Sequence, residues 1–266
     1  MTGTRTNRVL RFGFTLGLTL ALAGLGCATG SGPGSVSRTD ERKAESHYKI
    51  GIERMREGRM ALAIREFQAA AEFDPTDAWI QLSMAEAYRL KGYPKLAEES
   101  LLEALRLRPD FQQARLNLSA LYVQLERYDE AIAQTQSLLA DPTFPVPWKA
   151  LTNQGWAQYE LGLLQDARWS LEQAVEYHET YWQAILNLGI LDAEEGNRLE
   201  ALERFDQVLA LTPGSLAVSE ANYRIGEIYI ALGNRARAVE HLTAAASNRP
   251  SGPWGKRSED YLKRLE

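Results

Sequence analysis

Residues 182–213 read WQAILNLGILDAEEGNRLEALERFDQVLALTP, and the spacing of a few residues in this stretch decides the fold. Gly196 predicts the end of a first helix, because a residue with positive φ is least costly as glycine. Ala201 and Phe205, four residues apart, mark the apolar side of a second helix. Pro213 predicts the end of that helix, which proline cannot continue. The stretch is therefore expected to form a helical hairpin.

The same spacing occurs six times between about residue 44 and residue 250. The copies are expected to begin at about Ala44, Ala78, Gln112, Trp148, Trp182 and Ser219. Each copy has one alanine where the second helix is expected to cross the first, since a larger side chain would push the helices apart: Ala63, Ala97, Ala131, Ala167, Ala201 and Ala238. Glycines are expected at the turns inside five of the hairpins: Gly58, Gly92, Gly162, Gly196 and Gly233.

This pattern (L-G-x2-Y, then A-x3-F, then P) resembles the tetratricopeptide repeat. The resemblance implies an all-α fold: a right-handed superhelical solenoid of six tetratricopeptide (TPR) helical hairpins over 43–250, with a capping helix at 253–266. The implied repeats span about 44–77, 78–111, 112–147, 148–181, 182–218 and 219–252. Such arrays form binding surfaces, so the expected function is to bind a partner and not to transform one.

Two copies are longer than the others. One excess lies at 141–147, where Pro142, Pro145 and Pro147 replace a short turn, and the other lies around Pro213. Both are expected to be extended loops inside an unbroken array.

The N-terminus predicts a secretory signal. Arg5, Arg8 and Arg11 precede an uncharged apolar run that ends at Gly26, and this run is too short and too rich in glycine for a stable transmembrane helix. Residues 1–26 are therefore expected to be a signal peptide.

The only cysteine, Cys27, follows this run directly in the sequence LAGLGC at 22–27. The hexapeptide resembles the lipobox of bacterial lipoproteins, which implies that Cys27 is lipidated and becomes the new N-terminus. A signal peptide followed by a chance cysteine is the alternative. Ala28 in place of aspartate implies the outer membrane, so the expected location is the periplasmic face of that membrane. Residues 27–42, rich in Gly and Ser, are expected to be a flexible tether.

Charge and motifs exclude other classes of function. The formal net charge is −5, with both signs mixed along the chain, whereas nucleic-acid binding needs a clustered basic face. His47, His178 and His241 lie in different copies, and no metal-ligand spacing, nucleophile motif or phosphate-binding glycine loop occurs. No enzyme activity, cofactor, metal ion or small-molecule substrate is expected.

The TPR resemblance places several positions of each first helix on a concave groove, and these are the candidate partner-binding residues: Trp79, Leu116, Asn117, Asn153, Trp156, Tyr159, Leu186, Asn187 and Ile190. Asparagine occupies one groove position in three successive copies. Because an amide both donates and accepts, this asparagine ladder could hold the backbone of an extended peptide. The alternative is that these amides only cap or solvate the helices. For Trp156 and Tyr159 the alternative is packing within their own repeat.

A lipidated array of six such repeats also resembles the type IV pilus biogenesis lipoproteins, the pilotins of the PilW, PilF and Tgl type. The most specific stretch is LADPTFPVPWKALTNQGWAQYELG at 139–162, where a proline-rich loop precedes an Asn-x-Gly repeat opening. This resemblance implies assembly or localisation of the pilus secretin, with a secretin subunit as the partner. A scaffold lipoprotein of the Tad pilus, of secretion or of cell-wall machinery, including an accessory subunit for peptidoglycan enzymes, is the alternative.

Overall fold

The computed structural model describes residues 36–211 and 214–265, and all regular elements in these ranges are helices. The predicted signal peptide and Cys27 lie outside the described residues. Val36–Glu266 form one compact unit. Within the described residues, no helix combines the length and the apolar character needed to cross a membrane.

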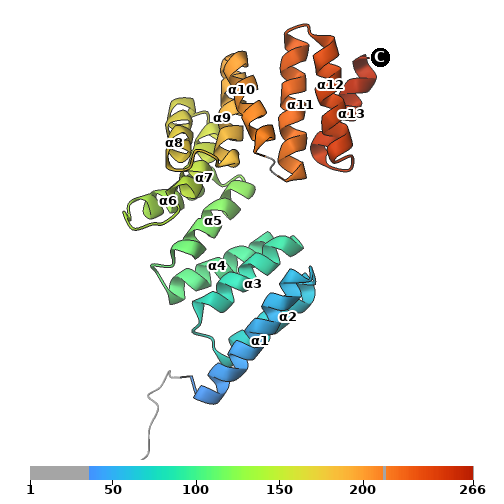
Figure 1. Cartoon of the computed structure of the whole chain (residues 1–266). Coiled ribbons are helices and arrows are strands. Elements are labelled where there is room, and N and C mark those ends of the chain that lie inside the picture. Colours follow the sequence, from blue (N-terminus) through green and yellow to red (C-terminus); the bar gives the residue numbers. More distant parts are fainter. Residues whose placement is uncertain (1–35, 212–213, 266) are drawn as a thin grey trace, which may run out of the picture. The chain divides into compact units, whose positions relative to one another are not determined.

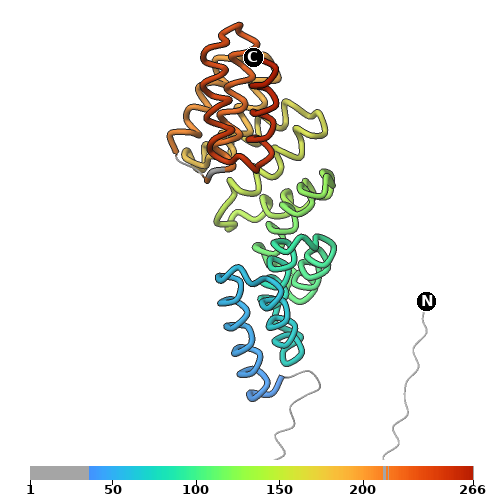
Figure 2. Tube along the Cα trace, turned by 90° about the vertical axis from the view of Figure 1, so that its right-hand side faces the viewer, coloured from blue at the N-terminus to red at the C-terminus, as the bar shows by residue number. Residues whose placement is uncertain are grey.

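In the described ranges, twelve helices pair into six consecutive hairpins, and a thirteenth packs on the last hairpin. Figures 1 and 2 show this order along the chain. The helices of the described ranges are α1 (Arg38–Arg56), α2 (Met60–Phe73), α3 (Ala78–Lys91), α4 (Pro94–Leu107), α5 (Gln112–Gln124), α6 (Tyr128–Leu139), α7 (Pro147–Glu160), α8 (Leu164–Tyr177), α9 (Trp182–Glu195), α10 (Arg198–Ala210), α11 (Ser215–Ala231), α12 (Arg235–Asn248) and α13 (Pro253–Leu265). The predicted all-α array of hairpins with a C-terminal helix is confirmed.

Small residues let the two helices of each hairpin approach closely. The six alanines predicted at the crossings, from Ala63 to Ala238, are all buried. On the facing helix, Gly189 shows why a side chain is absent: a Cβ built there would lie 2.7 Å from Cε1 of Phe205. Apolar contact at this distance is strongly repulsive, so the residue pair fixes how closely α9 and α10 pack.

The turns inside the hairpins use the left-handed backbone conformation. The five predicted turn glycines have φ between 72° and 86°. The third hairpin lacks a glycine, and there Glu126 takes the same conformation with φ 59°. A residue with a Cβ is sterically disfavoured in the left-handed conformation, so this turn is strained relative to the other five.

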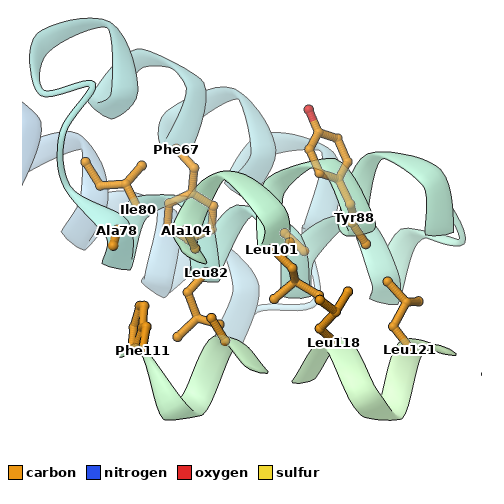
Figure 3. Packing of buried hydrophobic residues seen from close by; sticks show 14 of the residues in the cluster. Phe67, Ala78, Ile80, Leu82, Tyr88, Leu101, Ala104, Phe111, Leu118 and Leu121 are labelled. Atoms are coloured by element: carbon orange, nitrogen blue, oxygen red, sulfur yellow. The ribbon is translucent and has the colours of Figure 1, made fainter. Parts of the chain in front are cut away.

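Neighbouring hairpins share one apolar core. Figure 3 shows Phe67 of α2, Leu101 of α4 and Leu118 of α5 in the same cluster, with Tyr88 of α3 beside them. Each hairpin therefore buries apolar surface against the next one, which is how a repeat array gains stability.

One hairpin replaces an apolar contact with charges. Tyr88 and Tyr122 are buried at the same position of α3 and α5, where α9 has Asp192. The Asp192 carboxylate accepts hydrogen bonds from Arg168 of α8 at 2.7 Å and from Arg204 of α10 at 2.6 Å. Arg168 also donates to Glu195 at 2.7 Å. The buried carboxylate is thus paired on both sides, as burial of a charge requires.

Two predicted boundaries are wrong. Helix α1 begins at Arg38, so the last part of the predicted tether 27–42 is helical, because Ser37 caps the helix by accepting from the Asp40 N–H. Helix α11 begins at Ser215 and not near Ser219. The extra residues around Pro213 therefore lengthen a helix instead of forming only an extended loop, and Ala217 in the added turn is buried.

The proline-rich loop is present as predicted. Helix α6 ends at Leu139 and α7 begins at Pro147, and the segment between them is not helical. Phe144 from this loop is buried in a cluster with Leu116 and Leu138. The loop is therefore packed onto the array at its centre.

Candidate partner-binding face

The first helices of the hairpins lie next to each other, and α7 contacts both α5 and α9. We call the surface formed by the exposed and half-buried side chains of the first helices α3, α5, α7, α9 and α11 the A face. The three predicted ladder residues, Asn117, Asn153 and Asn187, occupy equivalent positions on α5, α7 and α9, and all three are half-buried. The structure thus places them in one row.

The three amides are not equivalent. The Asn117 side-chain oxygen accepts from the Gln113 amide at 2.9 Å. The Asn153 amide donates to the Ser119 hydroxyl at 2.9 Å, across to the neighbouring hairpin. The side-chain amide of Asn187 has no hydrogen-bond partner among the described residues. Of the three, Asn187 is therefore the one whose full donor and acceptor capacity is available to a ligand.

A polar hollow of about 440 Å³ lies between α3 and α5 and includes Asn117 in its wall. Glu86 and Arg89 line the same hollow and form a two-pronged ion pair at 2.6 and 2.8 Å. Ala120 and Gln124 complete the wall. These residues offer charged and amide groups to a partner, with apolar surface beside them.

The middle of the A face is aromatic. Trp156 and Tyr159 of α7 lie with their ring centroids 5.0 Å apart, and both are half-buried. They pack on the cluster of the next hairpin that contains Ile185, and the Tyr159 hydroxyl donates to the Glu194 carboxylate. Burial and this carboxylate raise the pKa of Tyr159. The two rings therefore join repeats four and five and also leave part of their surface exposed.

For three predicted groove residues, the prediction that they contact a partner is wrong. Leu116, Leu186 and Ile190 are 6, 5 and 2% exposed, and they belong to the core. Helix α5 contacts α4, α6 and α7, and α9 contacts α7, α8, α10 and α11. These neighbours bury positions that the repeat pattern alone assigned to the groove.

Trp79 is 48% exposed, so it is available to a partner, but it lies apart from the asparagine row. It is the second residue of α3 and packs edge-on against Phe111, with ring centroids 4.7 Å apart. It lines a different hollow, at the end of the first helices, together with the proline-rich loop.

Arg224 occupies the asparagine position in α11 and was not among the predicted groove residues. The Nε of Arg224 and the Oε1 of Gln183 on α9 are buried and lack a hydrogen-bond partner among the described residues. Glu220 lies 3.7 Å from Arg224, and burial raises its pKa. The repeat register contained the signal, because Arg224 stands two residues before Gly226 as Asn187 stands two before Gly189.

Within residues 36–211 and 214–265, no group of three or more His, Cys, Asp or Glu could hold a metal ion. His47 pairs with Glu66 at 2.8 Å, His241 lies 3.0 Å from the Asn222 oxygen, and His178 packs against Trp148. Each described histidine thus has a local structural contact.

The tetratricopeptide repeat family model matches residues 82–143, 121–185 and 186–253, which together cover more than half of the chain. The chain belongs to the tetratricopeptide repeat family. The hairpins and their small-residue crossings are features of this family. Proteins of this family are scaffolds for protein interaction.

Two solved structures of this family resemble the chain along nearly their whole length. PilW, a widely conserved type IV pilus biogenesis factor, gives a TM-score of 0.69 at 23% identity and is covered over 97%, against 80% of this chain. PilF of Pseudomonas aeruginosa gives a TM-score of 0.68 at 16% identity and is covered over 100%, against 84% of this chain. At these identities the likeness shows the fold.

Among curated relatives, the human protein O-mannosyl-transferase TMTC1 is 27% identical over 180 residues, which is 67% of this chain and 20% of that protein. The chain spans less than half the length of the curated relatives it matches.

Proposed function

We propose that this TPR protein is an outer-membrane lipoprotein, anchored through Cys27 and facing the periplasm, whose A face binds a segment of the type IV pilus secretin during secretin assembly. The observation that supports this proposal best is how much of the PilW and PilF chains this chain covers. The chain matches PilW and PilF over 97% and 100% of their lengths, whereas it matches only a part of its longer relatives. The array of hairpins thus has nearly the same extent as the PilW and PilF chains, which supports a similar role.

The chemistry of the A face suits an extended segment of a protein. The Asn117 hollow offers an ion pair and amides, and Trp156 and Tyr159 offer apolar area beside it. Asn187 can donate to a backbone carbonyl and accept from a backbone N–H. Aromatic anchors supply most of the binding energy at such surfaces, and amides fix the orientation of the chain.

A lipid anchor and a tether would present this face to its partner. Two acyl chains hold a protein stably on a membrane, whereas one binds only marginally. The role is that of a scaffold without catalysis, because binding an unassembled subunit needs only complementary surface.

The proposal is tested by deleting the gene and measuring heat- and SDS-resistant secretin multimers. We expect the multimers to be lost and to return with the wild-type gene, but not with Cys27→Ser, which should leave the outer-membrane fraction. Trp156→Ala should reduce multimer yield when the strains are compared at equal amounts of folded protein, because Trp156 also packs on repeat five. Trp169→Ala, which removes an exposed tryptophan on α8, a second helix, is the control and should leave the yield unchanged.

Normal multimers and normal pili in the deletion strain would contradict the pilus role. A defect confined to the Tad pilus, to secretion or to cell-wall synthesis would assign the same scaffold to that machinery instead. Cys27→Ser protein that stays in the outer membrane would contradict the lipid anchor.

A further inference from the structure

A hollow of about 540 Å³ lies where the first helices begin, at the edge of the A face. We call it the edge hollow. Its wall is built from the start of α3, the α4–α5 loop with the start of α5, and the proline-rich loop: Trp79, Arg108, Asp110, Phe111, Gln112, Gln113, Asp141, Thr143, Phe144, Pro145 and Val146. Two consecutive repeats, the second and the third, thus contribute to one site.

The walls of the edge hollow are held in place. Gln112 of α5 donates to the Asp141 carboxylate at 2.5 Å, and the same carboxylate accepts from the Thr143 N–H at 2.9 Å and hydroxyl at 2.7 Å. Phe111 and Phe144 are buried beneath it. The site is therefore formed before a ligand arrives, which reduces the entropy that binding must overcome.

A cation, the Arg108 guanidinium, already lies against the Trp79 and Phe111 rings of the edge hollow. The Arg108 guanidinium carbon lies 3.4 Å from the Phe111 ring centroid and 5.1 Å from that of Trp79. No carboxylate of the described residues lies within 4.0 Å of Arg108. The rings thus attract positive charge, as expected from the negative face of an aromatic ring.

The carboxylates around the hollow favour a cationic ligand as well. Asp110 is exposed and forms no ion pair with any described residue. The pKa of Asp141 is lowered by the hydrogen bonds from Thr143 and Gln112, so it is ionised at neutral pH. From residue 36 onward the chain has 27 basic and 35 acidic residues, a net charge of −8 (27 − 35). Both the local and the overall charge attract a basic segment.

We propose that the edge hollow binds a lysine or arginine side chain of an extended partner segment, with the cation against the Trp79 indole and Asp110 as its counter-charge. The hollow continues into the A face, because Gln113 lines it and donates to Asn117 at 2.9 Å. A segment lying on the A face can therefore reach the hollow with its next residues. The proposal does not depend on which partner occupies the A face.

The test uses the full-length chain with its six tryptophans ¹⁵N-labelled at the indole nitrogen and two synthetic peptides, GSGKFPKGSG and GSGEFPEGSG. We expect the lysine peptide to shift the Trp79 indole signal in NMR titration and the glutamate peptide to leave it in place. Asp110→Lys should weaken binding of the lysine peptide about three- to five-fold, the range of one exposed charge pair. Asp206→Lys, an exposed carboxylate on α10, is the matched control.

Arg108→Gln tests whether the edge hollow attracts a cation or only leaves Trp79 accessible to any peptide. It removes a like charge and a competitor for the indole, so it should raise the affinity for the lysine peptide. Equal binding of both peptides, an unmoved Trp79 signal, or equal effects of Asp110→Lys and Asp206→Lys would each overturn the proposal.

Discussion

Asn153 of α7 donates its side-chain amide to the Ser119 hydroxyl of α5 at 2.9 Å, and Ser119 donates in turn to the Leu116 carbonyl at 2.7 Å. The Ser119 side chain is fully buried. This short chain of hydrogen bonds links the first helices of repeats three and four. Asn153 is therefore part of the structure as well as of the A face.

Replacing Asn153 should destabilise the fold, whereas replacing Asn187 should not. Asn153→Ala removes one partly buried hydrogen bond, for which we expect a loss of about 1 kcal/mol in the free energy of unfolding. Asn187→Ala breaks no hydrogen bond of the described residues, so its melting temperature should stay at the wild-type value. Denaturant unfolding of both variants measures the difference. Equal stabilities would show that the Asn153 hydrogen bond contributes nothing.

The turn of the third hairpin can be improved. Glu126→Gly relieves a positive φ of 59° at an exposed residue, and we expect a gain of about 1 kcal/mol. Thermal unfolding should show a higher midpoint. Glu99→Gly, exposed in the middle of α4, is the opposite control and should lose about 1 kcal/mol. If both variants lose stability, the turn is not strained.

The close approach of α9 and α10 does not tolerate a methyl group. Gly189→Ala places a Cβ 2.7 Å from the Phe205 ring, and overpacking of this kind costs about 1–3 kcal/mol. Gly214→Ala makes the same chemical change at a position where a Cβ would meet nothing within 4 Å, and it should cost less, because only the preference for glycine over alanine at the N-cap of α11 is lost. Circular dichroism melts compare the two. A neutral Gly189→Ala would mean that Phe205 moves aside without cost.

Stability should depend on pH through Glu220. Burial raises the pKa of this carboxyl in the folded state above its unfolded value, despite Arg224 at 3.7 Å. A raised pKa means that folding favours the protonated form, so stability falls as pH rises through the folded-state pKa. Glu220→Gln cannot ionise. We therefore expect its stability relative to wild type to be greater at pH 7 than at pH 4, measured by urea unfolding, and the reverse trend would contradict the burial argument.

Much of the fold follows from residue spacing. The alanines from Ala63 to Ala238 recur in all six hairpins and the turn glycines in five, because each hairpin brings its two helices together in the same way. Exceptions to the repeat are harder to predict. Ser215 could open a helix or belong to a loop, and only the burial of Ala217 in the folded chain decides for the helix. Glu126 carries no local signal for a left-handed conformation.

The candidate site was only partly predictable. The repeat register placed Asn117, Asn153 and Asn187 in one row, as the structure has them. The register could not show that Ser119 already holds Asn153, because this contact depends on how two helices pack. Leu116 and Ile190 were misplaced for the same reason, since exposure is a property of the neighbouring hairpins and not of position along one helix. The edge hollow joins residues from two repeats and cannot be read from the pattern of either repeat alone.

The pairing of Asp192 with Arg168 and Arg204 has a consequence for how the array comes apart. Repeat proteins can open from their ends, one hairpin after another, because each unit depends only on its neighbours. Asp192 connects the second helix of repeat four to both helices of repeat five through one buried carboxylate. Detaching repeat five would separate Arg168 from both Asp192 and Glu195, so it would break two ion pairs at once. We therefore expect fraying from the C-terminal end to pass through the sixth hairpin more easily than through the junction between repeats four and five.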